Sequence, residues 1–288
     1  SYAKSKTAAV IDLLLNFGSG AARFDKYAGV ENVEGTNYND DINGNGAANT
    51  LFGLDGNDRL IGGGGNDRLE GGDGDDFMEG GSGADTFIGG AGIDRVSYFH
   101  EKSGVNVYLH GAANTGAATG DTFQGVEKIE GTIYNDVIQG NGQDNYLYGL
   151  SGADVMSGGG GNDVLDGGDG GDILDGGDGD DRILAADETG YWPDIIVGGS
   201  GTGDTVDYFG AIAGVAADLT ANTAGGAAIG DIFTAVENVV GSYHGDTLRP
   251  AANGYAFGDR GNDTIYDSIG TELLRGGRDI DFLSDNQF

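Results

Sequence analysis

The sequence predicts an all-β chain, a solenoid of short parallel strands arranged as three tandem modules, and three observations lead to this fold class. Glycine supplies 60 of the 288 residues and recurs every nine residues over long stretches. Each nine-residue unit carries one large apolar residue at its eighth position, which can provide the core of a stacked solenoid. A longer repeat, visible as VENVEGTNYND at 30–40 and VEKIEGTIYND at 126–136, marks the modules.

The first array of units begins at Gly53 and reads GLDGNDRLI, GGGGNDRLE, GGDGDDFME, GGSGADTFI and GGAGIDRVS. Its sixth position is always aspartate: Asp58, Asp67, Asp76, Asp85 and Asp94. Its eighth position is always apolar: Leu60, Leu69, Met78, Phe87 and Val96. Two weaker units precede the array in the same register and carry, at these two positions, Asp40 with Ile42 and Asn49 with Leu51.

A second array begins at Gly131 and repeats the pattern. Its sixth positions are Asp136, Asn145, Asp154, Asp163, Asp172 and Asp181. Its eighth positions are Ile138, Leu147, Met156, Leu165, Leu174 and Ile183. A third array, from Gly241, is degraded and keeps the aspartate and apolar pair at three places: Asp246 with Leu248, Asp263 with Ile265, and Asp281 with Leu283.

Each unit is expected to form a six-residue turn followed by a three-residue strand, because glycine permits turn angles that a Cβ atom forbids. Successive units alternate sides, so two units complete a coil of 18 residues and the turns stack into two ladders. The ladders expose backbone carbonyls and one aspartate per turn, and Ca²⁺ prefers such oxygen ligands. The sequence therefore predicts calcium sites between aspartates 18 residues apart: Asp58 with Asp76, Asp67 with Asp85, Asp76 with Asp94, Asp154 with Asp172, and Asp163 with Asp181.

The full set of predicted metal ligands is Asp40, Asp58, Asp67, Asp76, Asp85, Asp94, Asp136, Asp154, Asp163, Asp172, Asp181, Asp263 and Asp281. The runs GGGGNDRLEGGDGDDFMEGGSGADTF and GGGGNDVLDGGDGGDILDGGDGDDRI resemble the calcium-binding repeats of RTX proteins. The resemblance implies a right-handed parallel β-roll, about one calcium ion per pair of stacked turns, and export by type I secretion. Asn49 and Asn145 depart from the pattern, so weaker sites are expected there, and Arg278-Asp279 replaces the usual x-Gly.

Each module is expected to open with a strand-rich lead, which forms wider coils of the same solenoid without metal turns. The leads alternate apolar residues, as in Val105, Val107 and Leu109, which suits half-buried strands. A recurring GD-x-F predicts a turn and a core aromatic residue. The predicted ranges are 1–96 for module 1 (lead 1–34, calcium turns 35–96), 97–206 for module 2 (lead 97–130, calcium turns 131–206, insertion 185–197) and 207–288 for module 3 (degenerate turns 241–288).

The formal charge of −33 argues against nucleic acid and anionic membrane surfaces as partners and favours a cation. No apolar run approaches the ~20 residues of a membrane span, and the absence of cysteine excludes disulfides and thiolate metal sites. The expected partners are calcium, and beyond it a cell-surface polysaccharide or further copies of the chain. The expected location is extracellular, in association with a cell surface.

No catalytic residues are predicted, and the chain is expected not to be an enzyme. The histidines His100, His110 and His244 follow no metalloprotease spacing, and no phosphate-binding GxxxxGK[ST] segment occurs. Acidic pairs such as Asp75-Asp76 look like glycosidase dyads, but the repeat explains Asp76 as a metal ligand.

The predicted function is calcium-induced folding of a structural module in a surface-layer, adhesin or fibre protein. An alternative is the non-catalytic C-terminal domain of a secreted enzyme, since similar rolls follow the catalytic domains of proteases, lipases and alginate epimerases. A third possibility is carbohydrate binding through Tyr191 and Trp192 in the insertion, although a loop that covers the edge of the roll explains them as well.

Overall fold

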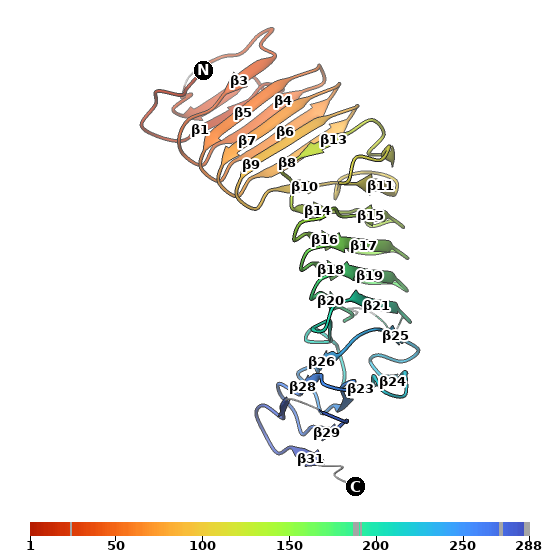
Figure 1. The fold of residues 1–288 in the computed structure, drawn as a ribbon. Coiled ribbons are helices and arrows are strands. Elements are labelled where there is room, and N and C mark those ends of the chain that lie inside the picture. Colours follow the sequence, from red (N-terminus) through yellow and green to blue (C-terminus); the bar gives the residue numbers. More distant parts are fainter. Residues whose placement is uncertain (24, 187–189, 191, 271–272, 285–288) are drawn as a thin grey trace. The chain divides into compact units, whose positions relative to one another are not determined.

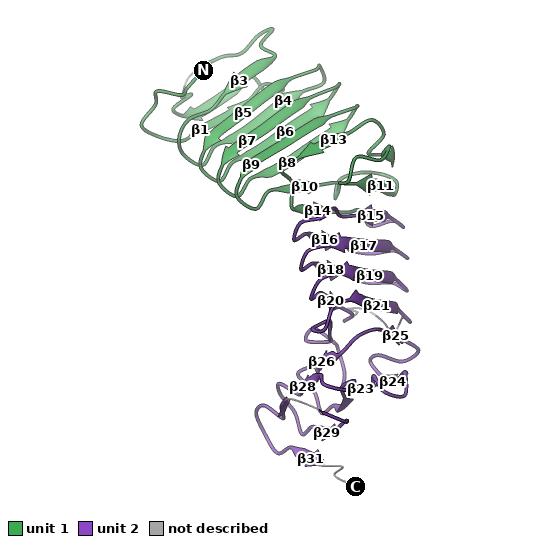
Figure 2. Cartoon of the chain, in the orientation of Figure 1, with its two compact units in different colours: residues 1–132 green, residues 133–288 purple. Residues whose placement is uncertain are grey.

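A computed structural model describes residues 1–23, 25–186, 190, 192–270 and 273–284, and within these ranges the chain forms strands and turns without any helix. It is a parallel β-solenoid, as the sequence predicted (Figure 1). The chain divides into two compact units, residues 1–132 and 133–288 (Figure 2). The three modules predicted from the longer repeat are sequence units, and their boundaries stay a prediction.

Unit 1 consists of two sheets that alternate along the chain and a short hairpin. The first sheet contains, in spatial order, β2 (Phe17–Gly20), β1 (Ala9–Asp12), β4 (Asp41–Asn45), β6 (Arg59–Gly64), β8 (Phe77–Ser82), β10 (Arg95–Ser97) and β14 (Lys128–Glu130). The second contains β13 (Thr122–Gln124), β9 (Thr86–Ala91), β7 (Arg68–Asp73), β5 (Thr50–Asp55) and β3 (Asn32–Glu34). The hairpin pairs β11 (Val105–Tyr108) with β12 (Thr115–Gly116).

Unit 2 repeats this arrangement with three sets of paired strands. The first set is β16 (Tyr146–Tyr148), β18 (Val164–Asp166), β20 (Arg182–Leu184), β22 (Thr205–Asp207), β26 (Asn238–Val240), β28 (Tyr255–Phe257) and β30 (Leu273–Arg275). The second is β15 (Val137–Gln139), β17 (Val155–Gly160), β19 (Ile173–Asp178), β21 (Ile195–Ser200) and β25 (Ile232–Thr234). The third is β24 (Thr223–Gly226), β23 (Val215–Asp218), β27 (Thr247–Arg249), β29 (Thr264–Tyr266) and β31 (Phe282–Ser284).

The eighth position of the repeat forms the core, as predicted. Parallel pairing places Leu60 of β6 beside Met78 of β8, and Met156 of β17 beside Leu174 of β19, one coil apart. These four side chains are at most 1% exposed. Leu283 differs, since it is 49% exposed in β31, which stands last in the strand order of its sheet among the described residues.

The leads form wider coils, but they also contain antiparallel pairs that the period-two pattern did not indicate. In the lead at 97–130, β11 and β12 form a hairpin. The chain then adds β13 beside β9 in one sheet and β14 beside β10 in the other. Phe123 of β13 pairs with Phe87 of β9, and their rings stack with centroids 5.5 Å apart. Phe123 is only part-buried, whereas Phe233 of the second GD-x-F is 5% exposed, so the predicted core aromatic residue is buried at the second of these two sites. The antiparallel pairs β1 with β2 and β23 with β24 have the same form in the other leads.

Candidate metal centre

The aspartates at the sixth position form continuous ladders. The backbone N–H of Asp58 donates to Oδ1 of Asp76 at 2.7 Å, and the N–H of Asp76 donates to Oδ1 of Asp94 at 2.9 Å. The same bond joins the other predicted pairs, Asp67 with Asp85, Asp154 with Asp172, and Asp163 with Asp181, each at 2.8 Å. The predicted stacking of aspartates 18 residues apart is thus present, with one carboxylate oxygen used to hold the neighbouring turn in register.

The second carboxylate oxygen, Oδ2, lies buried in these ladders. It has no hydrogen-bond partner among the described residues at Asp58, Asp67, Asp76, Asp85, Asp94, Asp154, Asp163, Asp181, Asp204 and Asp263. A buried acceptor without a partner is unfavourable by about 1–3 kcal/mol, and by more when it is charged. The repetition of the same lone oxygen through both units is the pattern expected of a row of cation positions.

A glycine beside each lone oxygen keeps a space open. A Cβ atom on Gly53 would collide with Oδ2 of Asp58 and would lie 2.6 Å from the carbonyl oxygen of Gly71. The same pair of clashes occurs at Gly149, with Asp154 and with the carbonyl of Gly167 at 2.6 Å. Two acceptor oxygens therefore converge on one point from stacked turns, and the first glycine of the repeat leaves that point free of side-chain atoms.

Burial makes these carboxylates costly to ionise. It raises the pKa of Asp58 to about 7 and the pKa of Asp154 to about 8. The charges of Asp76 and Asp172, one coil away, raise these two pKa values further, whereas the N–H donated by the preceding turn lowers them. The metal-free ladder therefore holds protons that ordinary surface aspartates would have lost at neutral pH.

The donor set fits calcium. No group of three or more His, Cys, Asp or Glu side chains converges within the described ranges, so backbone oxygens must complete any coordination shell. A carboxylate oxygen from one turn and a glycine carbonyl from the next are hard oxygen donors, which Ca²⁺ accepts in irregular geometries. The residues that would hold the ion are the ladder aspartates and the first glycines of the facing turns. Ligation by each predicted aspartate stays a prediction.

Asp194 and Asp204 are among the ladder members that the structure adds to the predicted set. Oδ1 of Asp194 accepts the N–H of Asp172 at 2.8 Å, and Oδ1 of Asp204 accepts the N–H of Asp181 at 2.8 Å. Their separations along the chain are 22 and 23 residues instead of 18, because extra residues interrupt the nonapeptide register. The motif D-x-apolar-x-G-G at 194–199 could have revealed Asp194, although it lies partly inside the predicted insertion.

At the start of two arrays, the carboxylate has partners from its own turn. Thr36 donates its N–H to Oδ2 of Asp40 at 2.5 Å and its hydroxyl to Oδ1 at 2.9 Å. Ser242 contacts Asp246 in the same way, at 2.7 and 2.9 Å. At Asn49, Oδ1 accepts the N–H of Asn45 at 2.8 Å. These first turns satisfy locally the oxygens that the later turns leave open.

The remaining predicted ligands lie in the same ladders. Asp136 donates its N–H to Oδ1 of Asp154 at 2.7 Å. Asp263 donates to Oδ1 of Asp281 at 3.2 Å, and a Cβ atom on Gly276 would collide with Oδ2 of Asp281. The third array thus keeps the geometry of the first two over its last described coil, despite its degraded sequence.

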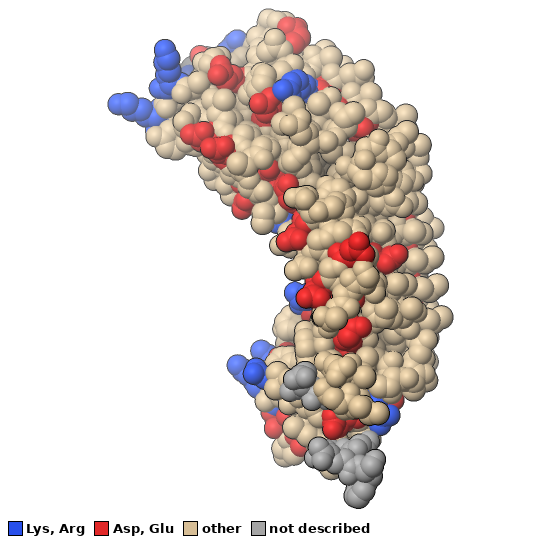
Figure 3. Space-filling model, viewed as in Figure 1, with Lys and Arg blue, Asp and Glu red and all other residues tan. Residues whose placement is uncertain are grey.

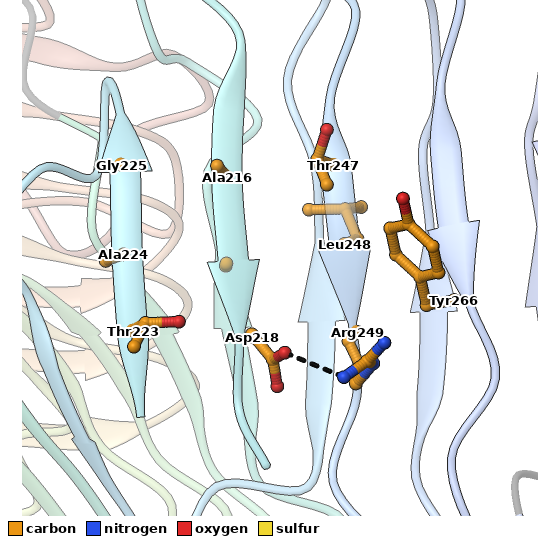
Figure 4. Close-up of a pocket in the computed structure, with 10 residues that line it drawn as sticks. Ala216, Asp218, Thr223, Ala224, Gly225, Thr247, Leu248, Arg249 and Tyr266 are labelled. Atoms are coloured by element: carbon orange, nitrogen blue, oxygen red, sulfur yellow. Dashed lines mark hydrogen bonds and ion pairs between the residues drawn. The ribbon is translucent and has the colours of Figure 1, made fainter. Parts of the chain in front are cut away.

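Charged groups outside the ladders have ordinary surface contacts. A groove of about 310 Å³ on β23, β24, β27 and β29 contains an ion pair between Asp218 and Arg249 at 3.0 Å (Figure 4). The Arg249 guanidinium lies over the ring of Tyr266, 5.0 Å from its centroid. Because Arg249 neutralises Asp218, this carboxylate is a poor candidate for a calcium ligand.

Two residues considered in the sequence for catalysis or carbohydrate binding, His100 and Trp192, lie at the surface. His100 contacts Glu79 at 3.0 Å with a side chain that is 66% exposed. Trp192 is 55% exposed, whereas Tyr191 lies outside the described residues. Acidic side chains are dispersed over the face of the molecule that Figure 3 shows. Among the described residues, none forms a helix with the length and apolar character of a membrane span.

Comparison with known families supports the same centre. The family model of the RTX calcium-binding nonapeptide repeat (four copies) matches residues 34–69, 61–96, 121–156, 148–183 and 251–283. Together these segments cover more than half of the chain, and they include every aspartate that the sequence predicted as a ligand. No curated protein matches the chain. The resemblance stated from the sequence motifs is therefore confirmed at the level of the family.

Proposed function

Because the chain belongs to the RTX calcium-binding nonapeptide repeat family, we propose that it is a structural module of a secreted bacterial protein that folds when it meets extracellular calcium. The coarse part of this statement, a calcium-binding structural repeat domain, follows from the family match. The observation that carries the rest is the row of buried Oδ2 atoms without a partner in the described ladders. They make the folded chain depend on a cation.

The ladder residues link ion binding to folding. Ordering glycine-rich turns loses more backbone entropy than ordering other residues, and each coil contributes only a thin core. Burial of the ladder carboxylates adds an electrostatic cost, as the raised pKa values of Asp58 and Asp76, both about 7, indicate. Bound calcium supplies positive charge to these oxygens, so its binding free energy becomes folding free energy. Contacts between stacked coils then make the transition cooperative.

The affinity expected of such a centre suits the outside of a cell. Extracellular calcium modules bind at ~10⁻⁴–10⁻³ M, far above the calcium concentration of a cytoplasm. A chain that stays unfolded inside the cell can be threaded through a type I secretion machine and folds after export. In this proposal the folded module has a structural role at the cell surface, as part of a surface layer, adhesin or fibre, and no catalytic role.

The proposal is tested by far-UV circular dichroism during a calcium titration of the full chain, from chelator to ~10 mM, a range that brackets extracellular module affinities. We expect a cooperative gain of β signal with calcium and no comparable gain with magnesium, which demands a stricter octahedral geometry. A chain that is already fully folded in chelator and does not respond to calcium would show that the acidic turns belong to a constitutive solenoid.

A further inference from the structure

A tyrosine and an aspartate 23 residues apart form the same contact in all three leads. The hydroxyl of Tyr98 donates to Oδ2 of Asp121 at 2.7 Å, and the hydroxyl of Tyr208 donates to Oδ2 of Asp231 at 2.6 Å. The hydroxyl of Tyr2 donates to Oδ2 of Asp25 at 2.5 Å. Tyr98 is 4% exposed and Tyr208 is fully buried. The contacts of Tyr98 and Tyr208 are buried, and that of Tyr2 lies at the surface. Because buried tyrosine hydroxyls need a partner, the two buried contacts are a structural part of their leads.

Asp121 and Asp231 are also members of the ladders. Oδ1 of Asp121 accepts the N–H of Asp85 at 2.8 Å, as Oδ1 of Asp85 accepts the N–H of Asp67. Oδ1 of Asp231 accepts the N–H of Asp194 at 3.0 Å. These two aspartates therefore continue the stacking. They differ from the aspartates of the calcium turns at Oδ2, which accepts a tyrosine hydroxyl here.

The local turn differs as well. In the calcium turns at 53–96, a glycine stands five residues before each aspartate, and its Cβ would strike the carboxylate, as at Gly80 and Asp85. Five residues before Asp121 stands Gly116, whose Cβ would instead strike the carbonyl of Gly104. Gly226 stands five residues before Asp231, and a Cβ atom on it would likewise strike the carbonyl of Gly214. In the lead turns this glycine therefore does not lie against the carboxylate, and a phenol hydroxyl occupies the position beside Oδ2.

We infer that Tyr98 and Tyr208 close the calcium ladders, by placing a hydroxyl donor where the calcium turns would hold an ion. The inference rests on the proposed function, since it concerns where the row of calcium positions ends. A neutral O–H donor stabilises the carboxylate whether calcium is present or absent, and it occupies the position that a further cation would need beside Asp121 or Asp231.

The second ladder of each array ends on a protein group as well. The N–H of Asp94 donates to Oε2 of Glu127 at 3.0 Å, and the N–H of Asp204 donates to Oε2 of Glu237 at 3.1 Å. Both contacts span 33 residues, so the leads of modules 2 and 3 interrupt the ladders in the same way. The row from Asp40 to Asp94 thus has a protein group at both ends, Thr36 at the first and Glu127 at the last. Ser242 has the same place as Thr36 at the start of the third array.

The test is the number of calcium ions bound by the full chain, measured by native mass spectrometry at saturating calcium and checked by isothermal titration. Asparagine keeps Oδ1 as an acceptor but removes the carboxylate charge. We expect Asp121→Asn and Asp231→Asn to bind as many ions as the wild-type chain, whereas the matched ladder variants Asp85→Asn and Asp181→Asn bind fewer. Loss of an ion in Asp121→Asn would overturn the inference, because that aspartate would then be a calcium ligand.

A gain-of-site variant provides the reverse test. Tyr98→Phe removes the hydroxyl and leaves Oδ2 of Asp121 in the state of the calcium turns, so we expect it to bind one additional ion, which Tyr98→Phe/Asp121→Asn loses again. Tyr38→Phe, at a 46% exposed position, is the control and should match the wild type. An ion count that stays the same in Tyr98→Phe as in the wild type would refute the inference. A wild-type chain that binds no calcium would refute the proposed function, and this inference with it.

Discussion

The calcium turns at 53–96 and the lead at 97–130 bury the same kind of carboxylate in two different ways. Asp85 and Asp121 each use Oδ1 to accept a backbone N–H from the turn below, at 2.8 Å in both cases. Oδ2 of Asp121 accepts the hydroxyl of Tyr98, whereas Oδ2 of Asp85 has no partner within the described residues. One turn is complete without an ion and the other is not, although both belong to one ladder.

The difference originates in the side chains that the two kinds of turn can contribute. The calcium turns consist largely of glycine, so they bring backbone carbonyls close to the carboxylate but no donor. One coil of the lead contains more residues than a calcium coil, since Asp85 and Asp121 lie 36 residues apart instead of 18. The longer chain segment allows a tyrosine side chain to reach the ladder. Compact turns thus depend on a cation from solution, and longer coils replace that cation with a side chain.

The largest expected effect comes from filling the space beside the lone oxygen. In Gly71→Ala, the new Cβ would collide with Oδ2 of Asp76 and lie 2.8 Å from the carbonyl oxygen of Gly89. We expect a loss of about 3 kcal/mol in the free energy of unfolding at saturating calcium, the upper range for overpacking, together with a higher calcium midpoint. Thermal unfolding and the circular dichroism titration measure the two quantities.

Gly46→Ala is the matched control for that variant. Gly46 lies in one of the two weaker units that precede this array in the same register, and a Cβ there would meet nothing within 4 Å. This variant should be unchanged or slightly more stable, because alanine restricts the unfolded chain by about 0.4–1 kcal/mol. Equal behaviour of the two alanine variants would mean that the space beside Asp76 is not where the cation lies.

A change of pH is expected to have an intermediate effect. It should change the stability of the metal-free chain and the affinity for calcium in opposite directions. Burial raises the pKa of Asp76 and Asp85 to about 7, from an ordinary value near 3.9. Between these values the folded metal-free chain binds more protons than the unfolded chain, so its free energy of unfolding falls as pH rises. Calcium requires the ionised carboxylates, so its affinity should rise over the same window and binding should release protons.

We therefore expect the chain in calcium-free buffer to gain β structure at about pH 5 relative to about pH 7.5, the window in which the ladder carboxylates lose their protons. Relief of repulsion within a chain of net charge −33 acts in the same direction. Repeating the measurement at about 1 M NaCl, where the Debye length is about 3 Å, separates the two causes. A metal-free chain that becomes more stable as pH rises would contradict the buried, protonated ladder.

The regular calcium turns could be predicted from the sequence more fully than the leads. The nine-residue period alone located the core residue and the ladder aspartate of every regular unit, since a solenoid places residues one period apart in equivalent environments. Met78 and Asp76 needed no further information. Asp194 and Asp204 were missed because a few extra residues changed the separation from 18 to 22 and 23, which breaks a strict period without breaking the coil.

The leads were harder to predict because their contacts are specific to side chains far apart in the chain. The antiparallel hairpin of β11 and β12 has the same alternation as a parallel strand, so pattern alone could not distinguish them. The contact of Tyr98 with Asp121 follows no local motif. One signal was the recurring GD-x-F, which contains Asp121 and Asp231. The other was the longer repeat, in which Ser97-Tyr98 aligns with Ser1-Tyr2 and each tyrosine precedes an aspartate by 23 residues.

The smallest expected effect is a gain in stability within a calcium turn. The second position of the repeat has a positive φ angle, as at Gly63 (104°) and Gly72 (121°), but Leu54 occupies this position with φ 93°. A left-handed backbone costs a residue with a Cβ about 1–2 kcal/mol, partly offset by the greater freedom of glycine in the unfolded chain. Leu54→Gly should therefore raise the free energy of unfolding by about 1 kcal/mol and lower the calcium midpoint. The control is Leu15→Gly, at a leucine that is 73% exposed and has no positive φ angle, and this variant should be slightly destabilised. A loss of stability in both variants would show that packing of the Leu54 side chain stabilises the fold by more than the strained backbone destabilises it.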